Sequence, residues 1–404
     1  MAKNTKPTIR FKGFTDAWEQ RKLGECFSEH VESMPDGEML SVTISSGIKK
    51  FSELGRHDNS NDDKSRYKKV SVGDIAYNSM RMWQGASGYS PYEGIVSPAY
   101  TVLSPVEGIV NSKCVSYLFK REDVIHTFKL NSQGITSDNW NLKYPVLSQI
   151  EIMVSKNIEE QEKIASFFSN LDNLITLHQR KYDSLVNVKK AMLEKMFPKN
   201  GETVPEIRFK GFTDAWEQRK LDSYLEVSNE KNFDNHFSKE DVLSVSGDFG
   251  IVNQINFKGR SFAGASVSNY GIVDYGDIVY TKSPLNANPY GIIKTNKGKA
   301  GIVSTLYAVY KVKNNVFPNF IQDYFNQNER VNNYLHPLVN KGAKNDMKVS
   351  AENALKGLVC FPKYEEQKII SDFFTNLDRL ITLHQRKLEK LKNIKKSCLE
   401  KMFV

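Results

Sequence analysis

The sequence predicts an α+β protein in which two β-rich domains are separated by two long, antiparallel coiled-coil helices. Three observations lead to this fold class: a fifteen-residue segment occurs twice, a long helical pattern occurs twice, and a set of short strand patterns recurs between them. A repeat unit of about two hundred residues is a duplicated domain rather than one turn of a solenoid. We therefore expect a tandem duplication with pseudo-two-fold symmetry.

The two exact repeats mark the beginning and the end of each unit. Residues 9–23 read IRFKGFTDAWEQRKL, and residues 207–221 read the same. The octapeptide LITLHQRK occupies residues 174–181 and returns at 380–387. The predicted boundaries are a first β-rich domain over residues 1–155, a long helix over 156–197, a linker over 198–205, a second domain over 206–360 and a second helix over 361–404.

Each long helical segment carries apolar residues at alternating steps of four and three. This spacing, sustained over more than four heptads, is typical of a coiled-coil seam. Both seams include a histidine and a lysine at matching positions, and a polar seam residue can fix the register of paired helices. The predicted seam residues are Ile164, Phe168, Leu171, Ile175, His178, Tyr182, Leu185, Lys189, Met192 and Met196 in the first helix, and Ile370, Phe374, Leu377, Ile381, His384, Leu388, Leu391, Lys395, Cys398 and Met402 in the second.

The domains between these markers share strand patterns although their sequences differ. A Gly-Asp turn followed by β-branched and aromatic residues occurs at 70–77 and again at 273–280, and Gly-Ile-Val-Ser occurs at 94–97 and 301–304. Short runs of this composition after a turn predict β-strands. Each domain is therefore expected to be rich in β-structure.

Loops and short helices fill the rest of each domain. Residues 78–91 and 281–299 are polar and glycine-rich, which predicts loops directly after the Gly-Asp-Ile strands. Helices are expected over residues 113–127 and 319–333. The two loops occupy equivalent places and differ in sequence.

The overall composition sets the compartment and favours one class of partner. The formal net charge is +9 and the pI about 9.0, which favours polyanionic partners without proving one. The four cysteines show no metal-ligand spacing, which indicates a reducing compartment and argues against a zinc module. Because the N-terminus has no apolar signal region and no run of 18 apolar residues occurs, we expect a cytoplasmic protein with no membrane association.

A second apolar stripe runs along each long helix. It could pack on the chain's own domains, or it could receive partner subunits while the seam joins the two helices. Two near-identical helices would then offer equivalent sites to two copies of one partner. The stripe residues are Leu174, Leu177, Leu185, Val188 and Met192, with Leu380, Leu383, Leu391, Ile394 and Cys398 as their counterparts. All of them except Cys398 are candidate partner-binding residues.

The duplication itself predicts a function. Two similar but non-identical domains held apart by a helix pair suit duplex DNA with two half-sites, because protein geometry sets the separation of half-sites. Since the domains differ, the half-sites should differ, and the double-stranded DNA target should be asymmetric and bipartite.

At this point the sequence resembles a known family. Each helix opens on Glu-Glu-Gln followed by Phe-Phe and Leu-Asp, at residues 159–172 and 365–378, and the entry repeats and Gly-Asp-Ile strands are also similar to that family. The family is the specificity subunit of type I restriction–modification enzymes. The resemblance implies a non-catalytic DNA reader that binds no cofactor itself. It also implies two methylation subunits carrying S-adenosylmethionine and two restriction subunits that use ATP and magnesium.

Candidate DNA-binding residues are taken from the divergent loops and the basic stretches. Arg or Lys reads guanine and Asn or Gln reads adenine through paired hydrogen bonds, and basic residues also contact phosphates. In the first domain the candidates are Lys49, Lys50, Lys64, Arg66, Lys68, Lys69, Asn78, Ser79, Arg81, Trp83, Gln84, Asn131, Gln133, Ser137 and Asn139. In the second domain they are Lys258, Arg260, Lys282, Ser283, Asn286, Asn288, Lys341, Lys344, Asn345 and Lys348.

Catalytic interpretations fit the sequence poorly. Residues 288–290 lack the second proline of an adenine methyltransferase motif, and residues 62–64 lie in a loop-like stretch rather than the strand that a nuclease motif needs. Residues 298–299 lack the remainder of a P-loop. The main alternative from another class is a coiled-coil scaffold protein whose β-rich domains bind other proteins.

Overall fold

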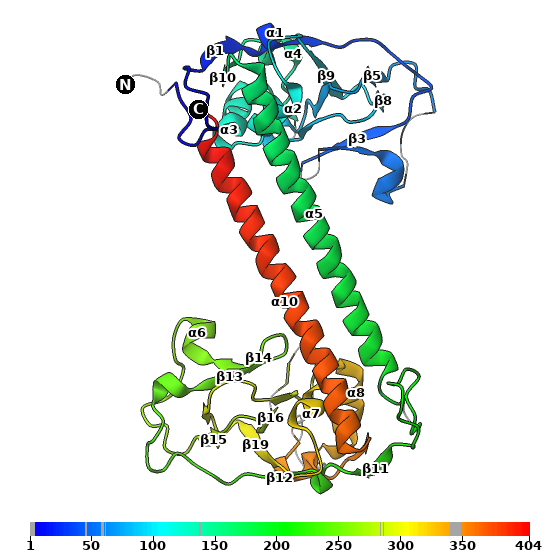
Figure 1. Cartoon of the computed structure of the whole chain (residues 1–404), viewed down its shortest axis with the longest axis vertical. Coiled ribbons are helices and arrows are strands. Elements are labelled where there is room, and N and C mark those ends of the chain that lie inside the picture. The colour runs from blue at the N-terminus through cyan, green and yellow to red at the C-terminus, as the bar shows by residue number, and fades with distance from the viewer. Residues whose placement is uncertain are drawn as a thin grey trace. The chain divides into compact units, whose positions relative to one another are not determined.

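The chain folds into two compact units. The computed structural model describes residues 5–44, 47–57, 60, 62–136, 139–199, 201–282, 284–285, 287–339 and 349–404. The first unit consists of Met1–Gln179 and Gln385–Val404, and the second of Arg180–His384. Each unit holds one β-rich domain, the beginning of one long helix and the end of the other (Figure 1).

The first unit is built on a four-stranded antiparallel sheet with strand order β2-β9-β6-β7. Three further pairs, β1-β10, β3-β4 and β5-β8, are also antiparallel. The strands are β1 (Glu19–Lys22), β2 (Phe27–Glu29), β3 (Leu40–Thr43), β4 (Gly47–Lys50), β5 (Lys68–Val70), β6 (Ile75–Asn78), β7 (Ser87–Tyr89), β8 (Gly94–Val96), β9 (Tyr100–Pro105) and β10 (Glu151–Val154).

The second unit repeats this topology. Its four-stranded sheet has the order β12-β19-β16-β17, with the pairs β11-β20, β13-β14 and β15-β18. The register also repeats, because Ile75 of β6 lies opposite Leu103 and Tyr89, and Ile278 of β16 lies opposite Tyr310 and Thr295. The strands are β11 (Glu217–Lys220), β12 (Leu225–Val227), β13 (Leu243–Ser246), β14 (Gly250–Asn253), β15 (Gly271–Val273), β16 (Ile278–Thr281), β17 (Ile293–Thr295), β18 (Gly301–Val303), β19 (Tyr307–Val312) and β20 (Leu358–Phe361).

The helix predicted over residues 113–127 is two helices, α2 (Ser112–Leu118) and α3 (Glu122–Asn131), and its counterpart is α7 (Pro318–Tyr324) and α8 (Asn328–Leu335). The backbone is extended at Arg121 and at Gln327, which ends the first helix of each pair. In the first unit the corner lets the rings of Phe119 and Phe128 meet edge to face at 5.1 Å. The remaining short helices are α1 (Leu23–Cys26), α4 (Tyr144–Leu147), α6 (Gln254–Lys258) and α9 (Ala351–Ala354), with 3-10 turns at Phe51–Leu54, Met82–Gln84, Leu221–Ser223, Lys239–Asp241 and His336–Leu338.

The two long helices are α5 (Ile158–Lys195) and α10 (Tyr364–Lys401), each of 38 residues. Each begins six residues before its first predicted seam residue. At a rise of 1.5 Å per residue, such a helix is about 57 Å long. The α+β class and the tandem duplication predicted from the sequence are confirmed.

Within each unit the two helix segments run antiparallel, as predicted. In the first unit Asp172 of α5 pairs with Lys395 of α10, and the ring of Phe168 stacks on Phe403 at 5.9 Å. In the second unit Lys189 pairs with Asp378, and Phe197 stacks on Phe374, also at 5.9 Å. Because the partner number falls as the α5 number rises, the direction is antiparallel in both places.

Each domain core is completed by residues from both helices. The first core includes Ile164 and Phe168 from α5 together with Met402 and Phe403, which follow α10. The second core includes Phe374 from α10 and the matching residues at the end of α5. Full burial of one such side chain contributes about 1.5–3 kcal/mol, so these residues fasten the helix ends to the domains.

Candidate nucleic-acid interface

A buried ion pair fixes each domain to the start of its long helix. The guanidinium of Arg10 donates two hydrogen bonds to Glu160, from Nε at 2.5 Å and from Nη2 at 2.8 Å, and Glu160 is fully buried. Arg208 and Glu366 form the same fork in the second unit, with both distances 2.7 Å. The hydrogen bonds that Arg208 donates to Glu366 raise the pKa of Arg208. Such bidentate pairs are geometrically specific, so the entry repeat and the Glu-Glu-Gln motif together set the position of each domain on its helix.

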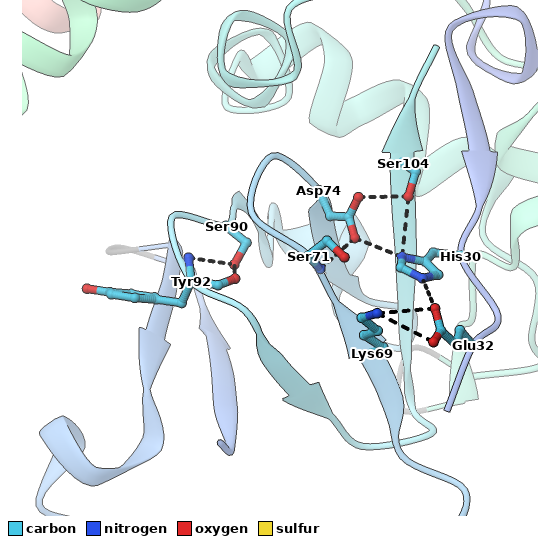
Figure 2. A network of polar contacts seen from close by, with 8 residues as sticks. All are labelled: His30, Glu32, Lys69, Ser71, Asp74, Ser90, Tyr92 and Ser104. Carbon is cyan, nitrogen blue, oxygen red and sulfur yellow. Dashed lines mark hydrogen bonds and ion pairs between the residues drawn. The ribbon is translucent and has the colours of Figure 1, made fainter. Parts of the chain in front are cut away.

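The aspartate of the first Gly-Asp-Ile motif organises the turn that leads into β6. Figure 2 shows Asp74 between two strands: its Oδ2 lies 2.9 Å from Nδ1 of His30 and accepts the backbone N–H of Ser71 at 2.8 Å, while Ser104 Oγ donates to its Oδ1 at 2.7 Å. Ser104 and Asp74 both approach the same ring nitrogen of His30, Ser104 at 3.3 Å. A hydrolytic triad needs the serine and the carboxylate on opposite nitrogens. This serine, histidine and aspartate are therefore arranged as a support for the turn.

In the second unit, charged side chains support the equivalent turn before β16. Asp277 accepts the backbone N–H of Asp274 at 2.7 Å, and Lys311, at the place of Ser104, contacts Asp277 at 2.9 Å and Asp274 at 2.8 Å. Burial raises the pKa of Asp277. Burial lowers the pKa of Lys311, but its carboxylate partners outweigh this and raise it overall. Both turns hold the following strand, and so the loop at its end, in one position.

The structure brings together the two polar loops of the first domain that the sequence placed 50 residues apart. The backbone N–H of Leu142 donates to Ser79 O at 2.9 Å, and the hydroxyl of buried Tyr77 donates to Leu142 O at 3.0 Å. The rings of Trp83 and Trp140 pack edge to face at 5.3 Å, with Lys129 over Trp140 at 5.6 Å. Basic, polar and aromatic groups thus share one surface at the end of β6.

The candidates in these loops differ in accessibility. Arg81, Gln133 and Asn139 are exposed, and Asn78, Trp83, Gln84 and Asn131 are half-buried. Ser79 is buried, and its hydroxyl hydrogen-bonds that of Thr101 at 2.8 Å, so it supports the loop and does not face outward. Ser137 lies outside the described residues.

A hollow of about 250 Å³ adjoins this surface. Two lysines, Lys68 and Lys143, contribute to its wall. Its lining residues are Glu29, Lys68, Ser79, Met80, Pro98, Ala99, Thr101, Asn141, Lys143, Tyr144 and Pro145. Sequence reasoning did not select Trp140, Asn141 or Lys143, although an aromatic residue within a polar loop was a signal for the first.

The predicted phosphate contacts of the first domain fall into two groups. Lys50 pairs with Glu38 at 2.7 Å, and Lys68 and Lys69 each lie 3.4 Å from a carboxylate, of Glu29 and Glu32 respectively. The others are Lys49 and Lys64, which are half-buried, and Arg66, which is exposed and lies near enough to Asp63 to help lower the pKa of that carboxyl. The second group is the better placed to meet a phosphate.

The corresponding loop of the second domain is closed onto α8. Asn288 is buried and donates from Nδ2 to Asn328 at 3.0 Å, and Asn332 donates to Ala287 O at 3.0 Å. Lys282 is half-buried and donates to a backbone carbonyl, and burial lowers its pKa. In this conformation Asn288 faces the protein. The candidates Ser283, Asn286, Lys341, Lys344, Asn345 and Lys348 lie outside the described residues.

The two remaining candidates of the second domain, Lys258 and Arg260, are exposed beside aromatic rings. Lys258 lies over Phe257 at 4.5 Å, and Arg260 lies over Phe262 at 4.8 Å. The exposed phenylalanines here were not singled out from the sequence. Phe257 is 37% exposed and Phe262 58%.

The two apolar stripes of the long helices differ in burial. The seam residues Phe168 and Leu171 are buried, whereas Leu177 of the second stripe is 60% exposed and its counterpart Leu383 is 44% exposed. Also exposed are Leu174, Val188, Leu380 and Ile394. Leu185 and Cys398 are half-buried, and Met192 and Leu391 pack against the second and first cores respectively. The central part of the second stripe is therefore open.

No described helix is long and apolar enough to cross a membrane. Within the same residues, no group of three or more histidine, cysteine or carboxylate side chains is arranged to hold a metal ion.

Comparison with known proteins defines the class: residues 16–187 match the model of the type I restriction modification DNA specificity domain. The MjaX type I restriction enzyme specificity subunit of Methanocaldococcus jannaschii is 22% identical over 378 residues, covering 88% of this chain and 83% of that one. The crystal structure of the type I restriction–modification S subunit from M. genitalium has the same fold, with a TM-score of 0.54, 15% identity and 99% of both chains covered.

Residues 16–187 thus match the type I restriction modification DNA specificity domain, and over most of its length the chain is similar to a type I restriction enzyme specificity subunit. The role that these matches support is DNA-sequence specificity, and the specificity subunit is the non-catalytic component. The scaffold alternative is not favoured by these matches.

Proposed function

We propose that the chain reads an asymmetric, bipartite site in duplex DNA, with one half-site for each β-rich domain. The observation that carries this proposal is that β6 of the first unit and β16 of the second occupy equivalent positions. The two strands lie in sheets of the same order and register and are preceded by the same Gly-Asp turn, but the loops that follow them differ in sequence. A shared frame with unlike loops is what two unlike half-sites require.

In the first domain, base contacts would come from the surface where the two polar loops meet. Arg81 suits guanine, and Gln133 and Asn139 suit adenine, because their paired donors and acceptors match those base edges in the major groove. Arg66, Lys49 and Lys64 would contact phosphates and fix the orientation of the duplex. In the second domain, Lys258 and Arg260 are the exposed described candidates.

The exposed stripes of the helices would seat the partner proteins. The repeat LITLHQRK places Leu174 and Leu177 on one helix and Leu380 and Leu383 on the other, all exposed. An apolar patch that recurs unchanged, while the domains diverge, suits two copies of one partner. We infer two methylation subunits, with S-adenosylmethionine, and two restriction subunits, with ATP and magnesium, as the rest of the complex.

We also propose that the boundaries at residues 155, 197, 205 and 360 separate interchangeable parts, and that the long helices set the spacer between half-sites. Inserting one heptad into both helices should then lengthen the spacer or abolish binding. An unchanged spacer would contradict this role.

The test is selection from a random duplex pool with the purified chain in complex with its methylation subunit. Low salt strengthens phosphate contacts, so even weak specific binding is captured. We expect a consensus of two unlike blocks separated by a fixed number of unspecified base pairs. Recovery of no consensus, or of one palindromic block, would contradict the proposed function.

A further inference from the structure

The second unit exposes three phenylalanines on one hairpin and the segment that follows it. Phe249 is 66% exposed, Phe262 58% and Phe257 37%, and the rings of Phe249 and Phe257 lie 5.5 Å apart. Exposed apolar clusters of this kind are unusual on a folded surface and mark places where another molecule binds. We call Phe249, Phe257, Phe262, Lys258 and Arg260 the aromatic–basic patch.

The hairpin holds Phe249 at its tip in a defined position. Ser246 of β13 pairs with Gly250 of β14, which leaves a three-residue loop over 247–249 (Figure 1 shows the hairpin). Gly250 has φ +69°, the left-handed conformation with which such loops end, and the N–H of Phe249 donates to Ser246 Oγ at 3.2 Å. The loop backbone is therefore ordered even though the ring is exposed.

The other face of the hairpin anchors it to the domain. Leu243 is buried, and Val245 and Ile251 pack with it against a small core that includes Val273 and Val309. The apolar residues of the hairpin thus divide into an inward set that holds the hairpin and an exposed ring, Phe249, which contacts the ring of Phe257. Packing within the domain accounts for the first set and not for the second.

Two arguments identify the molecule that would cover the patch. First, the cations of Lys258 and Arg260 lie over the rings of Phe257 and Phe262, so positive charge suited to phosphates borders this side of the patch, although the exposed Asp248 precedes Phe249 in the loop. Second, the patch belongs to one unit: Gly47 ends the equivalent hairpin loop of the first unit, and the residue before it is Ser46. A partner common to both units would need a surface common to both, whereas the DNA half-sites differ.

We propose that Phe249 is a wedge that enters a groove of the second half-site and partly unstacks one base step, while Lys258 and Arg260 contact the flanking phosphates. Apolar side chains used in this way kink duplexes, and the cost of unstacking is offset by the added contacts. Phe249 would then favour flexible pyrimidine–purine steps, which deform most readily. The proposal rests on the DNA-reading function above and names a specificity-determining residue for it.

The test uses the complex of the full chain with its methylation subunit and the duplex obtained by selection. 2-Aminopurine, whose fluorescence rises when it is unstacked, is placed at successive positions of the second half-site. We expect the wild-type complex to raise the fluorescence at one step. Phe249→Ala should abolish that rise and weaken binding roughly tenfold, since most of the benefit of burying the ring is lost. Phe249→Leu, which keeps an apolar wedge, should retain part of both effects.

Phe233→Ala is the matched control, because Phe233 is 65% exposed in the same unit and has no ring contact with the patch among the described residues. It should leave both the fluorescence and the affinity unchanged. An unchanged fluorescence rise with Phe249→Ala, or an equal loss with Phe233→Ala, would overturn the wedge. So would loss of a methylation subunit from the Phe249→Ala complex, because the patch would then bind protein.

Different results would contradict the DNA-reading function and the proposed role of Phe249. A wild-type complex that binds no duplex contradicts the DNA-reading function. A wild-type complex that binds its duplex without any rise in fluorescence contradicts the wedge alone.

Discussion

Lys395 donates from Nζ to Oδ1 of Asp172 at 2.5 Å, and the hydroxyl of Tyr117 donates to the other carboxylate oxygen at 3.0 Å. This contact joins the end of α10 to the beginning of α5 within the first unit. Burial, with Asp172 nearby, raises the pKa of Tyr117, so it acts as a neutral donor. The lysine that the sequence placed on the helix seam therefore fixes which residues of the two helices lie side by side.

We expect Lys395→Ala and Asp172→Ala each to lower the stability of the first unit. Because both side chains remain partly exposed, the coupling free energy from a double-mutant cycle should be modest, about 0.5–1 kcal/mol. Urea unfolding of the two single variants and the double variant measures it. A coupling of zero would mean that the pair does not help to set the register.

The buried ion pair between Arg10 and Glu160 should contribute more to the free energy of unfolding than the pair between Lys395 and Asp172. Arg10→Ala leaves the buried carboxylate without its partner, and we expect a loss of about 3 kcal/mol in the free energy of unfolding. Arg10→Lys keeps the charge but loses the planar two-point contact, so it should recover only part of the loss. If Arg10→Lys matches the wild type in denaturant unfolding, charge alone is sufficient at this junction.

The titration of Asp323 should make the stability of the second unit depend on pH. It is fully enclosed, and burial raises its pKa to about 6, although Lys297 and Ser371 partly counter this shift. Since the folded pKa lies above the ordinary value of 3.8, the folded unit binds more protons between these values. Stability should fall as pH rises from about 4 to about 6 and then remain at the lower level.

Asp323→Asn removes this titration, so the variant should be more stable than the wild type at pH 7, by about 2–3 kcal/mol at most. Its unfolding free energy should not follow the wild-type decline between pH 4 and 6. The control is Asp234→Asn, since Asp234 is exposed in the same unit. A wild-type protein whose stability does not change over this range would contradict the prediction.

The exposed stripe can be tested by counting bound subunits. Leu177→Glu and Leu383→Glu place a charge on open apolar surface, so neither should unfold the chain, and each should remove one methylation subunit. The double variant should bind none. Val186→Glu is the control, because Val186 is exposed on α5 on the side opposite Leu177 at 100° per residue. Native mass spectrometry gives the stoichiometry, and two bound subunits in the double variant would rule out this seat.

Exchanging residues 24–155 for the same region of a related specificity subunit should alter one half-site only. The expected result is a new sequence in one block, an unchanged sequence in the other and an unchanged spacer. Methylome sequencing of a host carrying the hybrid gives all three. If both blocks change, the assignment of one domain to each half-site is wrong.

The sequence predicted the features that recur and missed those that depend on distant contacts. The long helices and the strand at 75–78 follow from local periodicity. The strands Ser87–Tyr89 and Ile293–Thr295 lie in stretches read as loops, because their strand character comes from pairing with β6 and β16 and not from their own residues. The helix over 113–127 divides at Arg121, where ring packing across the corner outweighs helical continuity.

In the candidate site, too, local sequence predicted some features, and distant contacts determined the others. The loop at 78–84 could be selected because it follows a recognisable strand and has an unlike twin. Its union with the loop around Trp140 could not be predicted, since it rests on a backbone hydrogen bond between Leu142 and Ser79. The burial of Ser79 and Asn288 was equally invisible, because a polar residue in a glycine-rich stretch gives no sign of which way it faces.

Met402 and Phe403 close the core of the first unit, while Met196 and Phe197 close that of the second. During synthesis the ribosome must therefore pass residue 403 before the domain it made first can be finished. Until then, the partly open first core is exposed to chaperones and proteases for as long as the second unit takes to be translated. Removing Met402 and Phe403 would thus open the core of the first unit, which is translated first, and leave the core of the second unit complete.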